Sequence, residues 1–367
     1  MNVLKQFFFL IGFASAATAQ SPYISRVYEY RPAPGQFVNT MPEYTEGDTE
    51  ASMAQKAEEC LANNKKTLIS LGGYGGYVVF GFDHTIVNVE GEYDFKILGN
   101  AFFSDTQSPD DTRRGGSCEP GIVMVSRDAN GNGLPDDTWY ELAGSDYKNA
   151  ATKHNYTMTY HRPAADHTPT PDPKNKAITD TKYIAWESSA DESGFVYKNA
   201  YHKQNYYPDW ISADKMSFTG TRLPDNAVDL SSNGTNYLLY MFDWGYADNH
   251  PNETNEIEHP SEFKIDWAVD ANGNSVKLNG IDFVKVYTAI NQNAGWLGEV
   301  STEISGANDL HVDAVMPNAI TEISVSDISP ESDVFDLTGR KTSLTNAKRG
   351  IYIIKYKNGQ RKKIILK

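Results

Sequence analysis

The chain contains 367 residues, with 48 acidic and 33 basic side chains and a formal net charge of −15. A surface this acidic repels a phosphate backbone, so the composition argues against nucleic acid as a partner. Aromatic residues make up 12% of the chain. Abundant Tyr, Gly, Asn and Asp with few helical patterns favour an all-β protein.

Residues 1–19 have the pattern of a cleavable signal peptide. Lys5 supplies a positive start, Phe7–Phe13 form a short apolar core, and Ala17–Ala19 offers the small residues that a signal peptidase requires. A transmembrane anchor is the alternative, but crossing a bilayer needs about 20 apolar residues, and no later segment resembles a span. No cysteine follows the cleavage site, so lipid attachment is not expected. We therefore expect a secreted chain that begins at Gln20.

The segment that follows predicts one helix and many strands. After an extended, turn-rich stretch at 20–47, Met53, Ala57 and Leu61 recur on one face of a helix over Asp48–Ala62, with Asp48 as its N-cap. Strand patterns then follow one another without intervening helices. They cover 68–71, 77–82, 94–98, 121–126, 138–143, 156–161, 183–186, 215–220, 237–243 and 280–288. This order predicts an antiparallel β-sandwich of jelly-roll type over residues 20–314.

A Pro-, Asp- and Thr-rich stretch, residues 162–182, is expected to form an exposed loop within this domain. Elsewhere the domain contains the only two cysteines, Cys60 and Cys118. An exported chain with an even number of cysteines can hold a disulfide, and the alternative is two isolated buried thiols. The residues themselves leave both possibilities open.

The segment 128–137 (DANGNGLPDD) resembles the first part of an EF-hand calcium loop. Asp128, Asn130, Asn132 and Asp136 place oxygen side chains at positions 1, 3, 5 and 9, with glycine at position 6 for the sharp turn. The twelfth position is a tryptophan, so a carboxylate from elsewhere, or Glu141, would have to complete the shell. We predict a structural calcium ion here, and a polar β-turn is the alternative. The shorter copy at 270–274 (DANGN) reads better as a hairpin turn.

Two loops, residues 201–210 and 242–252, combine aromatic rings with amide, carboxylate or imidazole groups. This mixture suits the stacking of a sugar or of a large planar ligand. The predicted ligand-binding residues are Tyr206, Tyr207, Trp210, Trp244, Tyr246, Asp248, Asn249 and His250. The alternative is that these aromatic rings anchor long loops onto the sandwich.

No feature of the sequence requires that this protein be an enzyme. The sequence contains no Gly-x-Ser-x-Gly elbow and no His-Glu-x-x-His helix motif, and we expect His84 to be structural. Paired carboxylates for glycoside hydrolysis stay open, because Asp and Glu are plentiful and their spacing in space is not given by the sequence.

Residues 315–367 read as a second, small β-sandwich domain. Short alternating strands there are separated by Thr-Gly, Arg-Gly and Asn-Gly turns. The segment "VFDLTGRK … GIYIIKYKNGQRKKIILK" resembles the C-terminal sorting domain of type IX secretion in Bacteroidetes. That resemblance implies display at the cell surface, on the exterior face of the outer membrane. The alternative is an ordinary small β-domain with a basic tail.

Residues 23–310 resemble a family of Bacteroidetes cell-surface proteins. The resemblance is carried by segments such as "SLGGYGGYVVFGFDHTIVNVEGEYDFKILGNAF", "EPGIVMVSRDANGNGLPDDTWYELAGSDY" and "DWGYADNHPN". Members look like sandwich proteins, and some accompany outer-membrane corrinoid uptake systems. Cys60 and Cys118 stand where the family has other residues, which favours a disulfide between them.

The resemblance implies a non-catalytic binding protein that captures a corrinoid (vitamin B12), with an outer-membrane transporter as a possible partner. A carbohydrate-binding surface protein is the first alternative. A polysaccharide hydrolase and a structural adhesin without a small ligand are the others.

Overall fold

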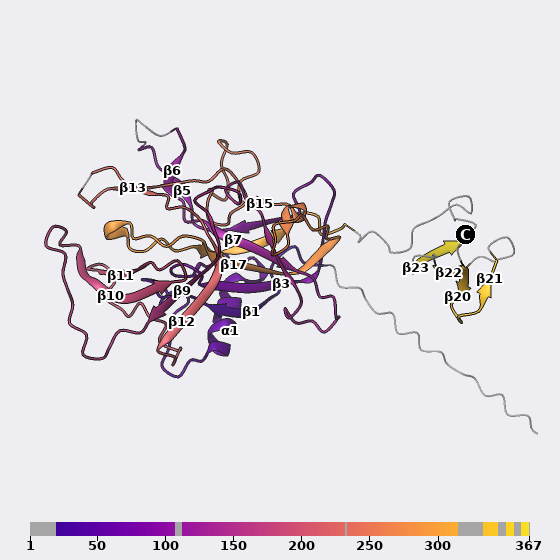
Figure 1. Cartoon of the computed structure of the whole chain (residues 1–367), viewed down its shortest axis with the longest axis horizontal. Helices are drawn as coiled ribbons and strands as arrows, with labels where there is room; N and C mark the ends of the chain where they lie inside the picture. Colours follow the sequence, from indigo (N-terminus) through magenta and orange to yellow (C-terminus); the bar gives the residue numbers. More distant parts are fainter. Residues whose placement is uncertain are drawn as a thin grey trace, which may run out of the picture. The chain divides into compact units, whose positions relative to one another are not determined.

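The computed structural model describes residues 20–106, 112–231, 233–314, 333–343, 350–355 and 361–366. The chain divides into two compact units, Met1–Asp313 and Ala314–Lys367, so the division lies one residue before the predicted one (Figure 1). The predicted signal peptide and residues 315–332 of the predicted tail domain lie outside the described residues.

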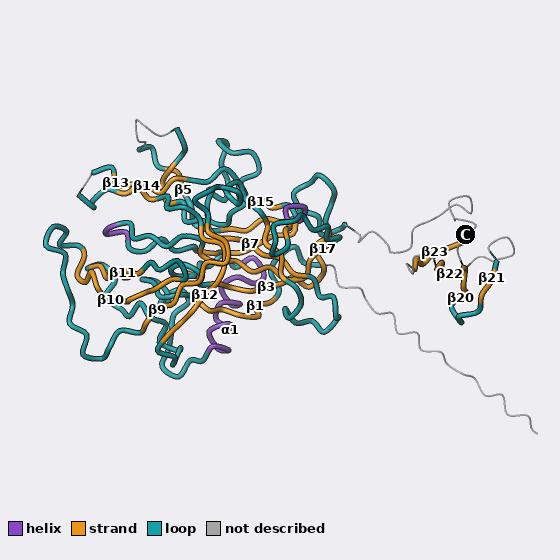
Figure 2. Tube along the Cα trace, viewed as in Figure 1, coloured by secondary structure: helices purple, strands orange, loops and turns teal. Residues whose placement is uncertain are grey.

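The first unit is built from antiparallel sheets, with 39% of the chain in strands and 7% in helices, which confirms the predicted all-β, sandwich-type class (Figure 2). Its largest sheet has six strands in the order β1-β3-β17-β7-β8-β16. These are β1 (Arg26–Arg31), β3 (Tyr77–Val87), β17 (Gly280–Thr288), β7 (Gly121–Ser126), β8 (Trp139–Leu142) and β16 (Ala268–Val269).

A second sheet has four strands in the order β11-β10-β9-β12. They are β11 (Ser193–Asn199), β10 (Ile178–Ser188), β9 (Lys153–His161) and β12 (Lys215–Arg222). Buried side chains from both sheets belong to one apolar cluster, in which Phe80 and Val284 of the first sheet join Met158 and Tyr160 of the second. This shared core makes the two sheets the layers of a sandwich.

Shorter sheets extend from the sandwich. One has the order β13-β14-β6-β5, another β15-β4-β19, and a third pairs β18 with β2. Their strands are β13 (Ala227–Asp229), β14 (Tyr237–Tyr240), β6 (Gly115–Ser117), β5 (Phe102–Phe103), β15 (Glu262–Phe263), β4 (Phe95–Leu98), β19 (Gly306–Asp309), β18 (Glu303–Ile304) and β2 (Ile69–Ser70).

Helix α1 (Glu50–Leu61) occupies the predicted segment and buries the predicted face of Met53, Ala57 and Leu61. Its N-cap is Thr49 rather than Asp48, because Thr49 and Ser52 form a reciprocal capping box. The Asp48 carboxylate instead accepts hydrogen bonds from Ser52 Oγ and Lys56 Nζ. Short 3₁₀ turns occur at Ala62–Asn64, Ile265–Trp267 and Gly295–Leu297. None of the helices in the described part of the chain has the length and apolar character needed to cross a bilayer.

Several elements were not expected from the sequence. The stretch 20–47 contains β1, whose pattern is broken by a register shift between Val27 and Glu29. The loop predicted at 162–182 ends earlier, because β10 begins at Ile178 and pairs with the unpredicted strand β11. The turn-like composition of residues 162–182 did not indicate that the last of these residues begin a long strand.

The two cysteines are free thiols, so the predicted Cys60–Cys118 disulfide is wrong. Cys60 lies on α1 and packs against the sandwich core. Cys118 is buried just after β6, where burial and the neighbouring carboxylates of Asp248 and Glu119 raise the pKa of its thiol. The two residues belong to different packing environments, which the count of cysteines does not reveal.

The second unit contains one described antiparallel sheet with the strand order β21-β20-β22-β23. The strands are β20 (Asp333–Asp336), β21 (Lys341–Thr342), β22 (Gly350–Lys355) and β23 (Arg361–Leu366). β22 and β23 lie within the second piece of the segment "VFDLTGRK … GIYIIKYKNGQRKKIILK", and β20 overlaps the first. Asp336 and Arg340 close the first hairpin through the turn that contains Gly339.

Candidate functional site

Seven of the eight predicted ligand-binding residues are buried, so their side chains do not present open stacking faces. Tyr206, Tyr207, Trp210, Tyr246, Asp248, Asn249 and His250 are all at most 8% exposed. Trp244 is the exception at 42%. The alternative reading, in which the aromatic rings anchor the loops, describes most of these residues.

The loop 201–210 is held by its own aromatic rings. Trp210 stacks on Tyr30 and Tyr44, with ring centroids 6.0 Å and 6.2 Å apart. The Tyr207 hydroxyl donates to the carbonyl of Ala213 at 2.8 Å. These contacts fix the loop against the sandwich core.

The loop 242–252 is closed by polar groups that face its own backbone. The Asn249 side chain accepts from the amide of Phe242 at 2.8 Å and donates to its carbonyl at 2.7 Å. His250 Nε2 donates to the same carbonyl at 2.9 Å. The ring centroids of Trp244 and Trp267 lie 4.6 Å apart, and both side chains line a separate pocket. The amide and imidazole groups of this loop therefore form hydrogen bonds within the loop and stabilise its conformation.

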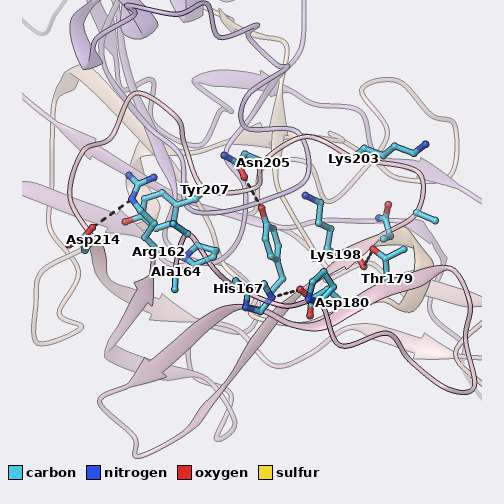
Figure 3. Close-up of a pocket in the computed structure, with 16 residues that line it drawn as sticks. Arg162, Ala164, His167, Thr179, Asp180, Lys198, Lys203, Asn205, Tyr207 and Asp214 are labelled. Carbon is cyan, nitrogen blue, oxygen red and sulfur yellow. Dashed lines mark hydrogen bonds and ion pairs between the residues drawn. The ribbon is translucent and has the colours of Figure 1, made fainter.

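A pocket of about 1100 Å³ opens beside the second sheet, and we call it the large pocket (Figure 3). Its walls come from the loop that starts at Arg162, from β10 and β11, and from the loop that follows β11. It is lined by Arg162, Pro163, Ala164, Ala165, His167, Pro169, Thr179, Asp180, Tyr183, Lys198, Asn199, Ala200, Lys203, Asn205, Tyr207 and Asp214. Of the predicted ligand residues, Tyr207 lines this pocket.

The large pocket is lined by three basic side chains, Arg162, Lys198 and Lys203, and by two acidic ones, Asp180 and Asp214. Arg162 lies over the ring of Tyr207 at 4.1 Å and 3.9 Å from the Asp214 carboxylate. Lys198 Nζ lies 4.6 Å from the ring centre of Tyr183. Burial lowers the pKa of Lys198, since desolvation disfavours the charged ammonium. Together with Lys203, these side chains make the pocket suited to a ligand that carries negative charge.

One histidine on the wall of the large pocket is fixed by a carboxylate. His167 Nε2 lies 2.5 Å from Asp180 Oδ2, as Figure 3 shows. Burial acts to raise the pKa of Asp180, but the bonds from His167 and from the amides of Thr170 and Lys182 outweigh it and lower that pKa. His167 Nδ1 forms no hydrogen bond with any described residue. This is the arrangement in which a histidine ligates a metal through its second nitrogen.

A second, smaller pocket of about 260 Å³ is lined by three glutamates, and we call it the acidic pocket. The glutamates are Glu119, Glu299 and Glu303. Burial raises the pKa of Glu299 to about 8 and that of Glu303 to about 7. Burial and neighbouring carboxylates raise the pKa of Glu119 well above its ordinary value. Tyr201 and Trp296, 66% and 40% exposed, also line the pocket with their rings 5.8 Å apart.

Neither pocket was predicted from the sequence. The sequence predicts a polar loop at residues 162–169, and Lys198 and Lys203 belong to no recognisable motif. In the acidic pocket, Glu299 and Glu303 lie four residues apart, with Ser301 between them. Such i, i+2, i+4 spacing places polar groups on one face of an extended chain, and this pattern could have pointed to two of the three glutamates.

The predicted calcium loop is exposed and folds around its first aspartate. Asp128 Oδ1 accepts from the amide of Gly131 at 2.7 Å, and its Oδ2 accepts from the amide of Gly133 at 2.9 Å. Asn130 and Asn132 both donate to the Asp136 carboxylate at 2.9 Å. These bonds bring the four predicted ligand residues together.

Glu141 does not complete that loop. Its carboxylate accepts from the Thr221 hydroxyl at 2.6 Å, and the side chain lines a different pocket together with Tyr287. Asp137 turns back instead and accepts from the amide of Ala129 at 2.9 Å. Asp137 is therefore the further carboxylate that the loop itself supplies.

Comparison with protein-family models and with curated proteins gives no match for this chain.

Proposed function

We propose that this chain is a non-catalytic secreted or cell-surface binding protein that captures a corrinoid in the large pocket. The observation that carries the proposal is the His167–Asp180 pair on the wall of a cavity of about 1100 Å³. Pockets for drug-sized ligands span roughly 300–1,000 Å³, so this cavity suits a ligand at or above that size.

A corrinoid matches the chemistry of the lining. Its cobalt accepts an imidazole as an axial ligand, and the nitrogen of His167 that faces away from Asp180 can supply one. Its nucleotide loop carries a phosphate, for which Arg162, Lys198 and Lys203 offer positive charge. Tyr183 and Tyr207 add apolar surface for the macrocycle.

Replacing His167 with alanine is expected to weaken cobalamin binding by at least about tenfold, since even the loss of an outer-shell partner of a metal ligand typically costs about 10- to 100-fold in metal affinity. Wild-type protein should bind in the micromolar range or tighter by calorimetry and shift the visible absorption of the corrinoid. His161→Ala is the matched control, because His161 on β9 pairs with Glu187 of β10 and does not line the pocket.

Absence of cobalamin binding at any accessible concentration would remove the corrinoid proposal. Binding that leaves the spectrum unchanged and does not respond to His167→Ala would keep corrinoid capture but remove the histidine's role.

Carbohydrate binding is the second candidate, and the exposed rings of Tyr201 and Trp296 at the acidic pocket favour it. Aromatic faces beside carboxylates suit sugar rings. A hydrolase at the same pocket would release reducing ends from a polysaccharide and lose that activity on Glu299→Gln. A structural adhesin would bind neither corrinoid nor glycan.

The signal peptide predicted at residues 1–19 and the tail at 315–367 support export and attachment at the outer face of the outer membrane. An outer-membrane transporter that receives the ligand is the partner this location implies.

Calcium binding at the loop 128–137 is part of the proposal, with a structural role. Chelation is expected to lower the melting temperature of the wild type, and Asp128→Ala should reduce that loss, because Asp128 organises the loop. A ligand at about 100 times its dissociation constant contributes about 2.7 kcal/mol. Asp270→Ala, in the similar turn 270–274, is the matched control. If Asp128→Ala responds to chelation as the wild type does, the loop is only a turn.

A further inference from the structure

Glu119 and Glu303, which line the acidic pocket, meet a third carboxylate, that of Asp248, which is buried beside them and does not itself line the pocket. Glu119 follows β6, Asp248 belongs to the loop after β14, and Glu303 begins β18. One oxygen from each lies within 4.8 Å of the other two. Two ligands of one calcium ion, each 2.3–2.6 Å from it, lie at most about 5 Å apart, so this spacing allows all three to bind one ion.

No lysine or arginine in the described part of the chain forms an ion pair with any of the three carboxylates. Their hydrogen bonds come from neutral donors. Asp248 accepts from the amides of Asn100, Ala101 and Glu303 at 2.7–2.9 Å. Buried charges in proteins are normally paired or bound to a metal, so this cluster lacks a positive charge.

The hydrogen bonds leave the cluster able to bind an ion. Ser70 and Ser301 both donate to Oε1 of Glu303, at 2.9 Å and 2.7 Å. Each oxygen of Glu119 accepts a single hydrogen bond, from the amide of Ser301 and from the hydroxyl of Ser117, both at 3.1 Å. Carboxylate oxygens have further lone pairs available, and the donors around them fix the orientation of each carboxylate.

A fourth acid points independently to a missing ligand. Glu299 is 5% exposed and lines the same pocket as Glu119 and Glu303. Its Oε1 accepts from the amide of Gln36 at 2.7 Å, but its Oε2 is buried and has no hydrogen-bond partner among the described residues. A buried, unpaired carboxylate oxygen costs free energy unless a ligand in the pocket meets it.

The Asn100 amide is a further neutral donor: with its nitrogen turned toward Asp248, it donates to both carboxylate oxygens at 3.1 Å.

We propose that Glu119, Asp248 and Glu303 bind a calcium ion beside the acidic pocket, with Glu299 facing the ion or its water shell. All the donors are oxygens, which suits a hard cation, whereas zinc and copper sites use histidine or cysteine. The pocket itself provides the path by which the ion reaches the carboxylates. This site is separate from the loop 128–137 and does not depend on corrinoid binding.

The test is calorimetric titration of CaCl₂ into chelator-treated Asp128→Ala protein, which removes the contribution of the loop 128–137. We expect one equivalent of calcium to bind. Adding Glu303→Gln should weaken that binding by at least about tenfold, as loss of a charged ligand requires. Glu141→Gln, a buried acid outside the cluster, is the control and should leave calcium affinity unchanged.

Circular dichroism and urea unfolding establish that each variant is folded, and Glu119→Gln serves as a second variant because Glu119 is only half-buried. Absence of binding up to about 10 mM calcium, above the affinity range of extracellular calcium modules, would overturn the proposal. Binding that neither glutamine variant weakens would overturn it as well, because the ion would then lie elsewhere.

Discussion

Replacing Trp210 with alanine is expected to lower the free energy of unfolding by about 3–5 kcal/mol, the usual cost of truncating a buried aromatic side chain. Trp210 is 8% exposed and stacks on Tyr30 and Tyr44, so the substitution opens a cavity between the 201–210 loop and the core. Urea denaturation measures the change. Trp210→Phe should cost much less, because it keeps a ring in the stack and removes an indole nitrogen that has no hydrogen-bond partner.

Trp244→Ala is the matched comparison, since both tryptophans were predicted as ligand contacts. Trp244 is 42% exposed and rests on Trp267, so its loss is expected to cost only about 1 kcal/mol. Equal destabilisation by the two alanine variants would contradict the anchoring role that we assign to Trp210.

Glu141 is expected to make the protein less stable as the pH rises through neutrality. Burial raises the pKa of its carboxyl from the ordinary 4.5 to about 7, although the hydrogen bond from the Thr221 hydroxyl acts in the opposite direction. Below the unfolded-state pKa both states are protonated, and the favourable contribution of Glu141 is fully present. As the pH increases to about 7, the unfolded state ionises more readily than the folded state, and this contribution is lost.

Glu141→Gln removes this dependence while preserving an oxygen for Thr221. The variant's advantage over the wild type should grow from pH 5 to pH 8 by on the order of 2–3 kcal/mol, since one pKa unit corresponds to about 1.4 kcal/mol. Urea unfolding of both proteins at each pH measures the difference, so other titrating groups cancel. A difference that stays constant with pH would show that the Glu141 carboxyl is not perturbed in the folded state.

The candidate sites illustrate why one-dimensional motifs mislead in a loop-rich sandwich. Tyr206, Tyr246 and His250 were predicted as ligand contacts from their residue types, yet each is buried and bonded within the protein. A tyrosine or histidine in a long loop serves equally well as an anchor or as a contact. The sequence does not give the path of the loop that decides between the two.

The pockets depend on contacts that are distant along the chain. The large pocket requires the loop after Arg162 to lie over β10 and β11, and the acidic pocket requires Glu119 to meet Glu303. Neither contact is accompanied by a local pattern in the sequence. In contrast, the loop 128–137 is a local structure, and its four predicted ligand residues do come together.

The sequence by itself determined the features that depend on neighbouring residues. The spacing of Met53, Ala57 and Leu61 placed α1, and alternating patterns placed most long strands and the all-β class, because burial of one face imposes a period on the chain. The two ends of the chain gave the expectation of export, which rests on sequence pattern. Tertiary structure decided which side chains are exposed, that the cysteines stay apart, and where carboxylates and cations gather. Those properties depend on how the sheets and loops pack in space, and chain order does not encode that packing locally.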